Sequence, residues 1–165
     1  MRKVKSAPLS AVLLSVASLS FSQNGSRPSA KVTQVQAALF SFTIRVSAPE
    51  KDLVVPYCSK GDDGTLKLCY MPDNFQVETP QGWQPVKLRF HPEARVLGRL
   101  AQDLWKVQPV TAGRSHEFSL AISKVEFAVE RGQRVRYIVD AWPDEKSMRN
   151  GGQPIRLVTP PFKCP

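Results

Sequence analysis

The chain has 165 residues, with 23 Lys and Arg against 14 Asp and Glu, so its formal net charge is +9. This length suits one domain with a core of its own, and no internal repeat or low-complexity tract divides the sequence. The basic residues are scattered rather than run together, a pattern that favours solubility over nucleic-acid binding. We therefore expect no nucleic-acid partner.

The N-terminus has the pattern of a secretory signal peptide. A basic start at residues 2–5 precedes an apolar run over residues 9–19, and Ser20 and Ser22 are the small residues that a signal peptidase reads. The apolar run is shorter than the about 20 residues that a membrane-spanning helix needs, and no later segment is long enough to span a bilayer. We expect an exported protein, secreted or periplasmic, without a membrane span.

Cleavage after Ser22 divides the chain into three predicted parts. The signal peptide occupies residues 1–22. A flexible lead-in follows over residues 23–34, where the sequence is at first rich in Ser, Asn, Gly and Pro. Residues 35–165 are predicted to form a single folded domain.

Apolar and polar residues alternate along this predicted domain, which is the period-two pattern of half-buried strands. The pattern predicts about eight strands, in chain order over residues 40–47, 53–58, 66–70, 75–79, 86–90, 118–123, 134–140 and 155–157. Helices are expected to be minor, with a partly helical spacing over residues 95–106 that Gly98 interrupts. Many short strands separated by turn residues predict the all-β class and an antiparallel β-sandwich.

The apolar faces of these strands predict the core. Five large residues lie in mid-strand on apolar faces and should be buried together: Phe42, Ile44, Leu88, Leu120 and Tyr137. The tryptophans Trp83 and Trp105 are also expected in the core, as most aromatic residues of a small sandwich are.

The sequence has three cysteines. Export would place them in an oxidising compartment, where a disulfide can form. If Asp63 and Gly64 form the tip of a hairpin, Cys58 lies directly opposite Cys69, and their β-carbons come within bonding range. We predict the Cys58–Cys69 disulfide on that ground. Cys164 could instead bond to either of them, remain a free thiol, or join two chains.

Catalytic and metal-binding motifs are absent from the sequence. His91 and His116 are the two histidines, and no nucleophile-elbow or metal-ligand spacing occurs. Asp62 and Asp63 lie between glycines, where a hairpin tip explains them better than calcium does. We predict no enzymatic activity, no cofactor and no metal.

A possible binding surface is formed by Asp140, Trp142, Arg134 and Arg136. Trp142 lies among acidic residues, a combination that suits carbohydrate but also fits a plain strand exit. The basic residues fall on the polar sides of separate strands, and would form one basic face if those strands were neighbours. We interpret the face as a solvated surface. Its basic residues are Lys87, Arg89, Arg134, Arg136 and Arg156.

Several segments resemble exported bacterial immunoglobulin-like domains of unassigned function. The likeness rests on Phe40–Val46, Lys51–Cys58, the Gly-x-Trp-x-Pro strand within Phe75–Val86, Arg114–Phe118 and Arg131–Val135. A more distant likeness is to the bacterial intracellular proteinase inhibitor family. The resemblance implies an immunoglobulin-like sandwich and says little about activity, because sandwiches host many functions.

The expected function is a non-catalytic binding or interaction module, monomeric, whose partner is a protein or surface polymer outside the cytoplasm. The alternatives are a proteinase-inhibitor-like module and a hydrolase without a recognisable motif.

Overall fold

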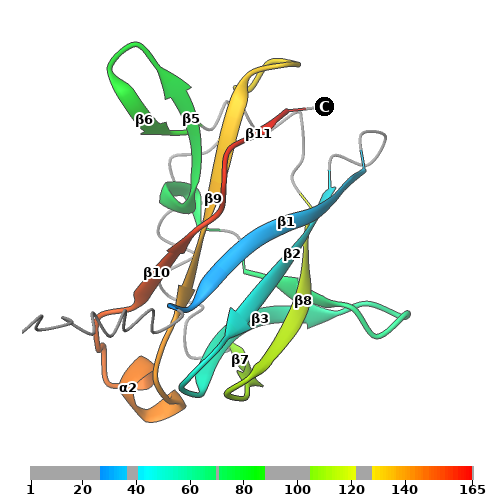
Figure 1. Ribbon diagram of the computed structural model, residues 1–165. Coiled ribbons are helices and arrows are strands. Elements are labelled where there is room, and N and C mark those ends of the chain that lie inside the picture. Colours follow the sequence, from blue (N-terminus) through cyan, green and yellow to red (C-terminus); the bar gives the residue numbers. More distant parts are fainter. Residues whose placement is uncertain (1–26, 37–40, 70, 88–104, 122–127, 165) are drawn as a thin grey trace, which may run out of the picture.

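The computed structural model describes residues 27–36, 41–69, 71–87, 105–121 and 128–164 (Figure 1). These ranges are mostly strand, which confirms the all-β class. The elements in chain order are β1 (Ser29–Gln36), β2 (Ser41–Ala48), β3 (Leu53–Lys60), β4 (Leu66–Leu68), the 3-10 turn η1 (Pro72–Asn74), β5 (Phe75–Thr79), β6 (Gly82–Pro85), β7 (Lys106–Val110), β8 (Arg114–Ala121), β9 (Arg134–Ala141), α2 (Glu145–Arg149), β10 (Ile155–Val158) and β11 (Phe162–Lys163).

Two sheets build the molecule. The first has six strands in the order β1-β2-β8-β4-β3-β7, and the second has the order β10-β9-β5-β6, with β11 also paired to β9. Every pair is antiparallel except β4 and β8, which run parallel with Leu66 beside Phe118. The described residues thus hold eleven strands rather than about eight, and the pairing is not wholly antiparallel.

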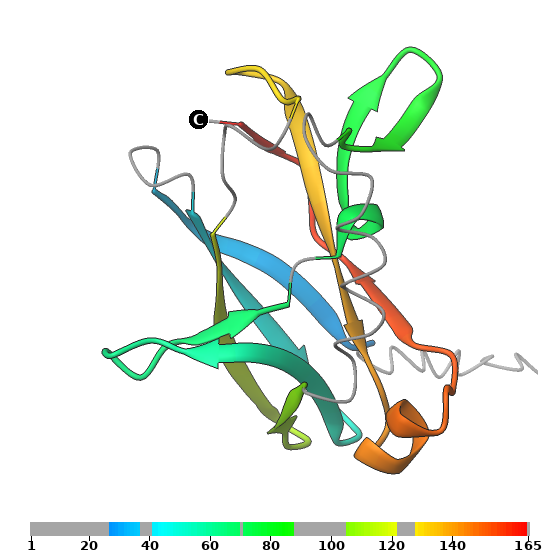
Figure 2. The same cartoon turned by 180° about the vertical axis from the view of Figure 1, so that it is seen from behind.

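Strand β9 belongs to the second sheet but also touches the first. It runs from the end of the molecule near the β5–β6 hairpin to α2 at the opposite end (Figure 2). At that far end Trp142 and Val54 exchange two backbone hydrogen bonds of 2.9 and 2.8 Å, which tie the end of β9 to β3. The two sheets are therefore joined at this corner.

The core lies between the two sheets, and β2 shows why. Its residues Phe42, Ile44, Val46 and Ala48 are all buried, while the alternate positions of the strand are half-exposed. Burying a Phe, Ile or Val side chain contributes about 1.5–3 kcal/mol, so the apolar face of β2 contributes several kcal/mol to the stability of the fold. Of the predicted core, Phe42, Ile44, Leu120 and Tyr137 are buried as expected, and Leu88 lies outside the described residues.

Strand β1 corrects the predicted start of the domain. Residues 29–34 were expected to belong to the flexible lead-in, but they pair with β2 as an edge strand of the first sheet. The alternation is hard to see in sequence because the register shifts between Val32 and Gln34, and Val35 is left 38% exposed. The predicted signal peptide over residues 1–22 lies outside the described residues.

The β3–β4 hairpin carries the predicted disulfide between Cys58 and Cys69. The reason given for it needs correction, because the hairpin register differs. Gly61 donates to the Thr65 carbonyl and Gly64 adopts a φ of +83°, so the turn is longer than a two-residue tip. The register also shifts between Tyr57 and Ser59, and this irregularity places Cys58 within reach of Cys69.

Four strands and one helix were not predicted as such. β1, β6, β7 and β11 are edge or very short strands, and α2 follows directly after Trp142, where a strand exit was expected. The predicted strand over residues 86–90 is not a strand at residues 86 and 87, and its remainder lies outside the described residues. Most of the helical spacing at 95–106 also lies outside them, and Lys106 begins β7.

Candidate functional site

A gap in the strand pairing along β9 gives the molecule a cleft. On one edge, β9 pairs with β5 as far as Tyr137 and next meets a strand at Trp142, which bridges to Val54. Between these two points the neighbours of β9 are η1 and the segment around α2. A cavity of about 500 Å³ opens there, within the usual size range of ligand sites.

The walls of this cleft combine aromatic, sulfur-containing and polar side chains from six parts of the chain. The lining residues are Pro56 of β3, Leu68 and Cys69 at the end of β4, Met71 and Asn74 around η1, Trp105 before β7, Tyr137, Val139, Asp140 and Trp142 of β9, and Met148 to Pro154 apart from Asn150. The disulfide therefore anchors one wall, and α2 with its following loop forms another.

Local sequence explains why α2 closes the cleft. Asp144 caps the helix by accepting hydrogen bonds from the backbone N–H and hydroxyl of Ser147, and these bonds lower the pKa of the Asp144 carboxyl. Gly151 then turns the chain with a φ of +74°, a conformation that favours glycine. The Trp142 Nε1 donates to the Gly152 carbonyl at 2.8 Å, which holds the loop against the indole.

Asp140 is the only carboxylate among the described lining residues. Its Oδ2 accepts a hydrogen bond of 2.9 Å from the Asn74 amide. Its Oδ1 is buried, lies 3.5 Å from the Arg156 Nε, and accepts no hydrogen bond from any described residue. A buried carboxylate oxygen normally has a donor, so this atom has unused hydrogen-bond capacity.

Arg149 is the second charged group of the cleft, and it is already paired. It forms an ion pair with Glu145 at 2.6 Å, and its Nη2 donates to the Trp105 carbonyl at 3.3 Å. Since Asp140 also has a nearby cation in Arg156, neither charge of the cleft is isolated. The cleft therefore suits a polar ligand without requiring a large net charge on it.

The outer face of β9 carries the remaining predicted site residues. Arg134 pairs with Glu78 at 2.7 Å. Arg136 instead lies over the Trp83 ring, 4.4 Å from its centroid, and its Nε donates to the Gln76 Oε1 at 2.8 Å. Burial lowers the pKa of Arg136, and the nearby positive charge of Arg156 lowers it further.

The structure thus divides the predicted binding surface into two adjoining parts. Trp142 and Asp140 line the cleft, whereas Arg134 and Arg136 lie on the outer face of the second sheet. Asp140 connects the two parts, because it lines the cleft and also lies beside Arg156. The predicted basic face exists for Arg134, Arg136 and Arg156, whose strands β9 and β10 are neighbours.

Other residues of the cleft were not predicted as site residues. Trp105 was expected in the core and is indeed 6% exposed, yet its side chain lines the cleft. Met71 was interpreted as core or rim, and Met148 carried no sequence signal because α2 was not predicted. Long-range packing brings these residues together, and residue type alone could not reveal it.

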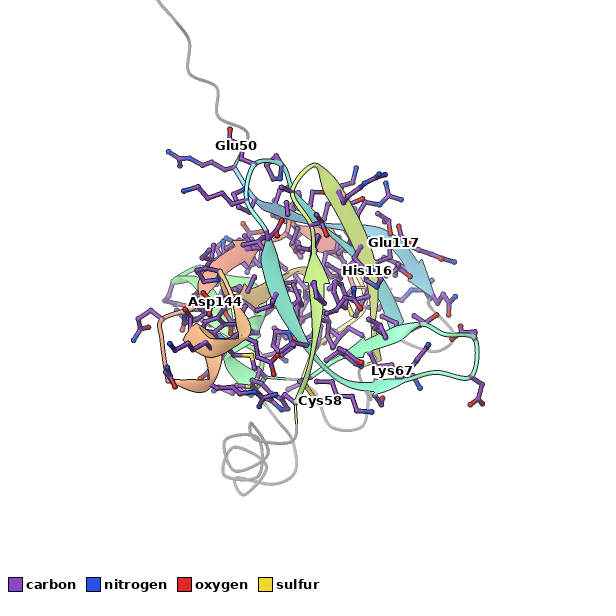
Figure 3. The ribbon with its side chains drawn as sticks, turned by 90° about the horizontal axis from the view of Figure 1, so that it is seen from below. Glu50, Cys58, Lys67, His116, Glu117 and Asp144 are labelled. Atoms are coloured by element: carbon purple, nitrogen blue, oxygen red, sulfur yellow. A yellow bond between two sulfur atoms is a disulfide. The ribbon has the colours of Figure 1, made fainter. Side chains whose placement is uncertain are left out.

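His116 lies away from the cleft. Figure 3 shows His116, Glu117 and Lys67 on the side of the molecule opposite Asp144 and α2. They line an open groove of about 1020 Å³, where Glu117 is held by Arg45 in an ion pair of 2.7 Å. His91 lies outside the described residues, and within the described ranges no cluster of three His, Cys, Asp or Glu side chains could hold a metal.

Comparisons with known proteins leave the chain without a counterpart: no protein family matches it, and no curated protein or solved structure matches it either. In the part of the chain that the structure describes, every helix is too short or too polar to cross a membrane.

Proposed function

We propose that the chain is an exported, non-catalytic binding module with an immunoglobulin-like β-sandwich, which holds part of its partner in the cleft beside β9. The observation that carries this proposal is a cleft of about 500 Å³ lined by Asp140, whose buried Oδ1 accepts no hydrogen bond from a described residue. A ligand that donates an O–H or N–H to this oxygen would satisfy it.

The chemistry of the walls defines the ligand further. Trp105, Trp142 and Tyr137 offer apolar surface, while Asn74 and Gln153 offer amide groups. Because the charges of Asp140 and Arg149 have partners already, the best fit is an uncharged group with both an apolar surface and hydrogen-bond donors. A sugar unit of a surface polymer has this character.

Export is supported by the signal-peptide pattern, and the Cys58–Cys69 disulfide is compatible with an oxidising compartment. Two packed sheets with mainly antiparallel strands support the immunoglobulin-like assignment. Catalysis has no support in the cleft, where Asp140 is the one described carboxylate and no histidine is among the described lining residues.

The test is to fill the cleft without altering the rest of the surface. Met148→Trp places a larger side chain in the wall, and Lys146→Trp adds the same group to an exposed position of α2 that does not line the cleft. Both variants and the wild type are titrated calorimetrically with neutral oligosaccharides, acidic oligosaccharides and peptide pools.

We expect any ligand that binds the wild type through the cleft to lose at least about tenfold in affinity to Met148→Trp, the effect of removing one good contact, and to bind Lys146→Trp normally. Two of the three tryptophans line the cleft, so wild-type fluorescence should change on binding. Equal affinity for both variants, or no binding by any class of compound, would refute the proposal.

A further inference from the structure

Two arginines on the outer face of the second sheet reach the same neighbouring segment. The Arg156 Nη2 donates to the Asn74 Oδ1 at 3.3 Å, and the Arg136 Nε donates to the Gln76 Oε1 at 2.8 Å. Asn74 ends η1 and Gln76 is the second residue of β5, so the two acceptors are two residues apart in the chain. Besides burial, the positive charge of Arg156 lowers the pKa of Arg136, which is the effect of a nearby guanidinium group.

An amide oxygen accepts a hydrogen bond from each of these two cations. Among the ion pairs of the described residues, none includes Arg136, whose partners are the Gln76 amide and the Trp83 ring. Arg156 has Asp140 at 3.5 Å, a longer separation than the 2.7 Å between Arg134 and Glu78. A neutral amide orients a guanidinium without cancelling its charge, so this part of the face keeps positive charge.

The strand residue between Arg136 and Asp140 is buried. Ile138 points to the same outer face of β9 as Arg136 and Asp140, yet it is only 4% exposed. The Arg136 guanidinium group also stacks on the Trp83 ring, which restricts its orientation. Contacts that orient a guanidinium group reduce the side-chain entropy that anion binding would cost, so the two groups are partly preorganised for a carboxylate.

We propose that Arg136 and Arg156 form an anion-binding site for the carboxylate groups of an acidic polysaccharide. This site lies beyond the cleft of the proposed function and does not require that the cleft be occupied. An anion between the two guanidinium groups would relieve their mutual repulsion and accept hydrogen bonds from both.

Features of the same face favour polysaccharide over other polyanions. Single-stranded nucleic acid needs exposed aromatic rings for base stacking, and the Trp83 ring is covered by Arg136. Membrane insertion needs a large apolar patch, and Val158 is the one exposed large hydrophobic residue described on this face. A polyuronate needs neither, since its carboxylates repeat along a polar chain.

The experiment measures binding of polygalacturonate oligomers to the full chain and to variants of two arginines on the same strand. Arg136→Gln removes the cation that lacks a described ion-pair partner. The matched control Arg134→Gln removes one that Glu78 already neutralises. Both variants lose the same charge, so a difference between them reports a site and not the net charge of the protein.

We expect Arg136→Gln to weaken polygalacturonate binding by about tenfold or more, as loss of a charge-assisted hydrogen bond does. Arg134→Gln should change it by less than about threefold, as expected for a solvent-exposed pair. Arg156→Gln should resemble Arg136→Gln, and Arg136→Lys should rescue only part of the loss because it lacks the planar fork. Thermal denaturation identifies any variant that has lost its fold. The binding affinities of the folded variants then test the proposed site.

Four outcomes would overturn the proposal: equal losses in Arg134→Gln and Arg136→Gln, absence of polygalacturonate binding at low salt, equal binding of neutral dextran, or tighter binding of single-stranded DNA or phosphatidylglycerol vesicles. Met148→Trp distinguishes this site from the cleft. Full polygalacturonate binding by that variant supports an independent anion site, even if every cleft ligand fails to bind the wild type.

Discussion

Phe42 links the two sheets through its side chain. It lies on β2 of the first sheet, with its ring centroid 6.2 Å from that of Phe75 on β5 and 4.9 Å from that of Phe162 on β11. It is 2% exposed, and the tilted and edge-on ring geometries are those that aromatic pairs favour. One side chain therefore contacts two of the three strands that pair with β9 in the second sheet.

Replacing Phe42 by Ala should lower the free energy of unfolding by about 3–5 kcal/mol, the usual range for a buried Phe. Chemical denaturation followed by circular dichroism measures the change. Val35→Ala on the neighbouring strand β1 is the control, because Val35 is 38% exposed and its truncation should cost under about 0.5 kcal/mol. A loss in Phe42→Ala no larger than in the control would contradict the assigned core.

The burial of a single residue was predictable where it depended on the alternation along one strand. The alternation over β2 suffices to bury Phe42 and Ile44, since a strand face is set by neighbours two positions away. The environment of Asp140 was not predictable, because its neighbours Asn74 and Arg156 come from separate elements. The sequence shows an acid near Trp142, but only the tertiary fold brings Asp140 to the cleft and leaves its Oδ1 without a described hydrogen-bond donor.

The β3–β4 hairpin is an element whose stability depends on a covalent link. The disulfide joins Cys58, an exposed residue at the register shift, to the buried Cys69 in the wall of the cleft. Without it, the short β4 strand would be held by its pairing with β3 and β8 alone.

Replacing both cysteines by Ala should lower the free energy of unfolding by roughly 2–3 kcal/mol, because the unfolded chain regains the entropy of a short closed loop. Denaturation of the double variant and of reduced wild type should give similar values. Peptide mapping without reduction provides the second check. A main fragment joining Cys164 to Cys58 or Cys69 would show that the hairpin pair is wrong.

At the level of elements, prediction succeeded for the central strands and for the edge strand β10, and failed for the edge strands β1, β6 and β7. β2, β8 and β9 have neighbours on both sides and keep a regular alternation, so each was found in sequence. β7 contains Pro109 and lies at an edge, where a missing backbone donor is tolerated. The predicted register of the β3–β4 hairpin was wrong by a residue. The turn at Gly64 and the register shift near Cys58 are irregularities that the alternation of apolar and polar residues does not reveal.

For the whole molecule, export remains a prediction with a direct measurement. The mature chain should begin near Gln23, since the pattern over residues 1–22 is read and removed by a signal peptidase. Intact-mass analysis of the periplasmic fraction and culture fluid, after expression of the full chain in a bacterial host, gives the N-terminus. Retention of Met1 in a soluble cytoplasmic product would exclude the predicted signal.

The parallel pair of β4 and β8 has a consequence for the time the chain needs to fold. It places Leu66 beside Phe118, and β8 also supplies the partner of β2, so the first sheet cannot form from its N-terminal strands alone. Folds dominated by such distant pairings reach the native state in about milliseconds to seconds, far more slowly than helical bundles. If the chain is exported as predicted, this delay gives a translocation channel time to move the chain before it folds.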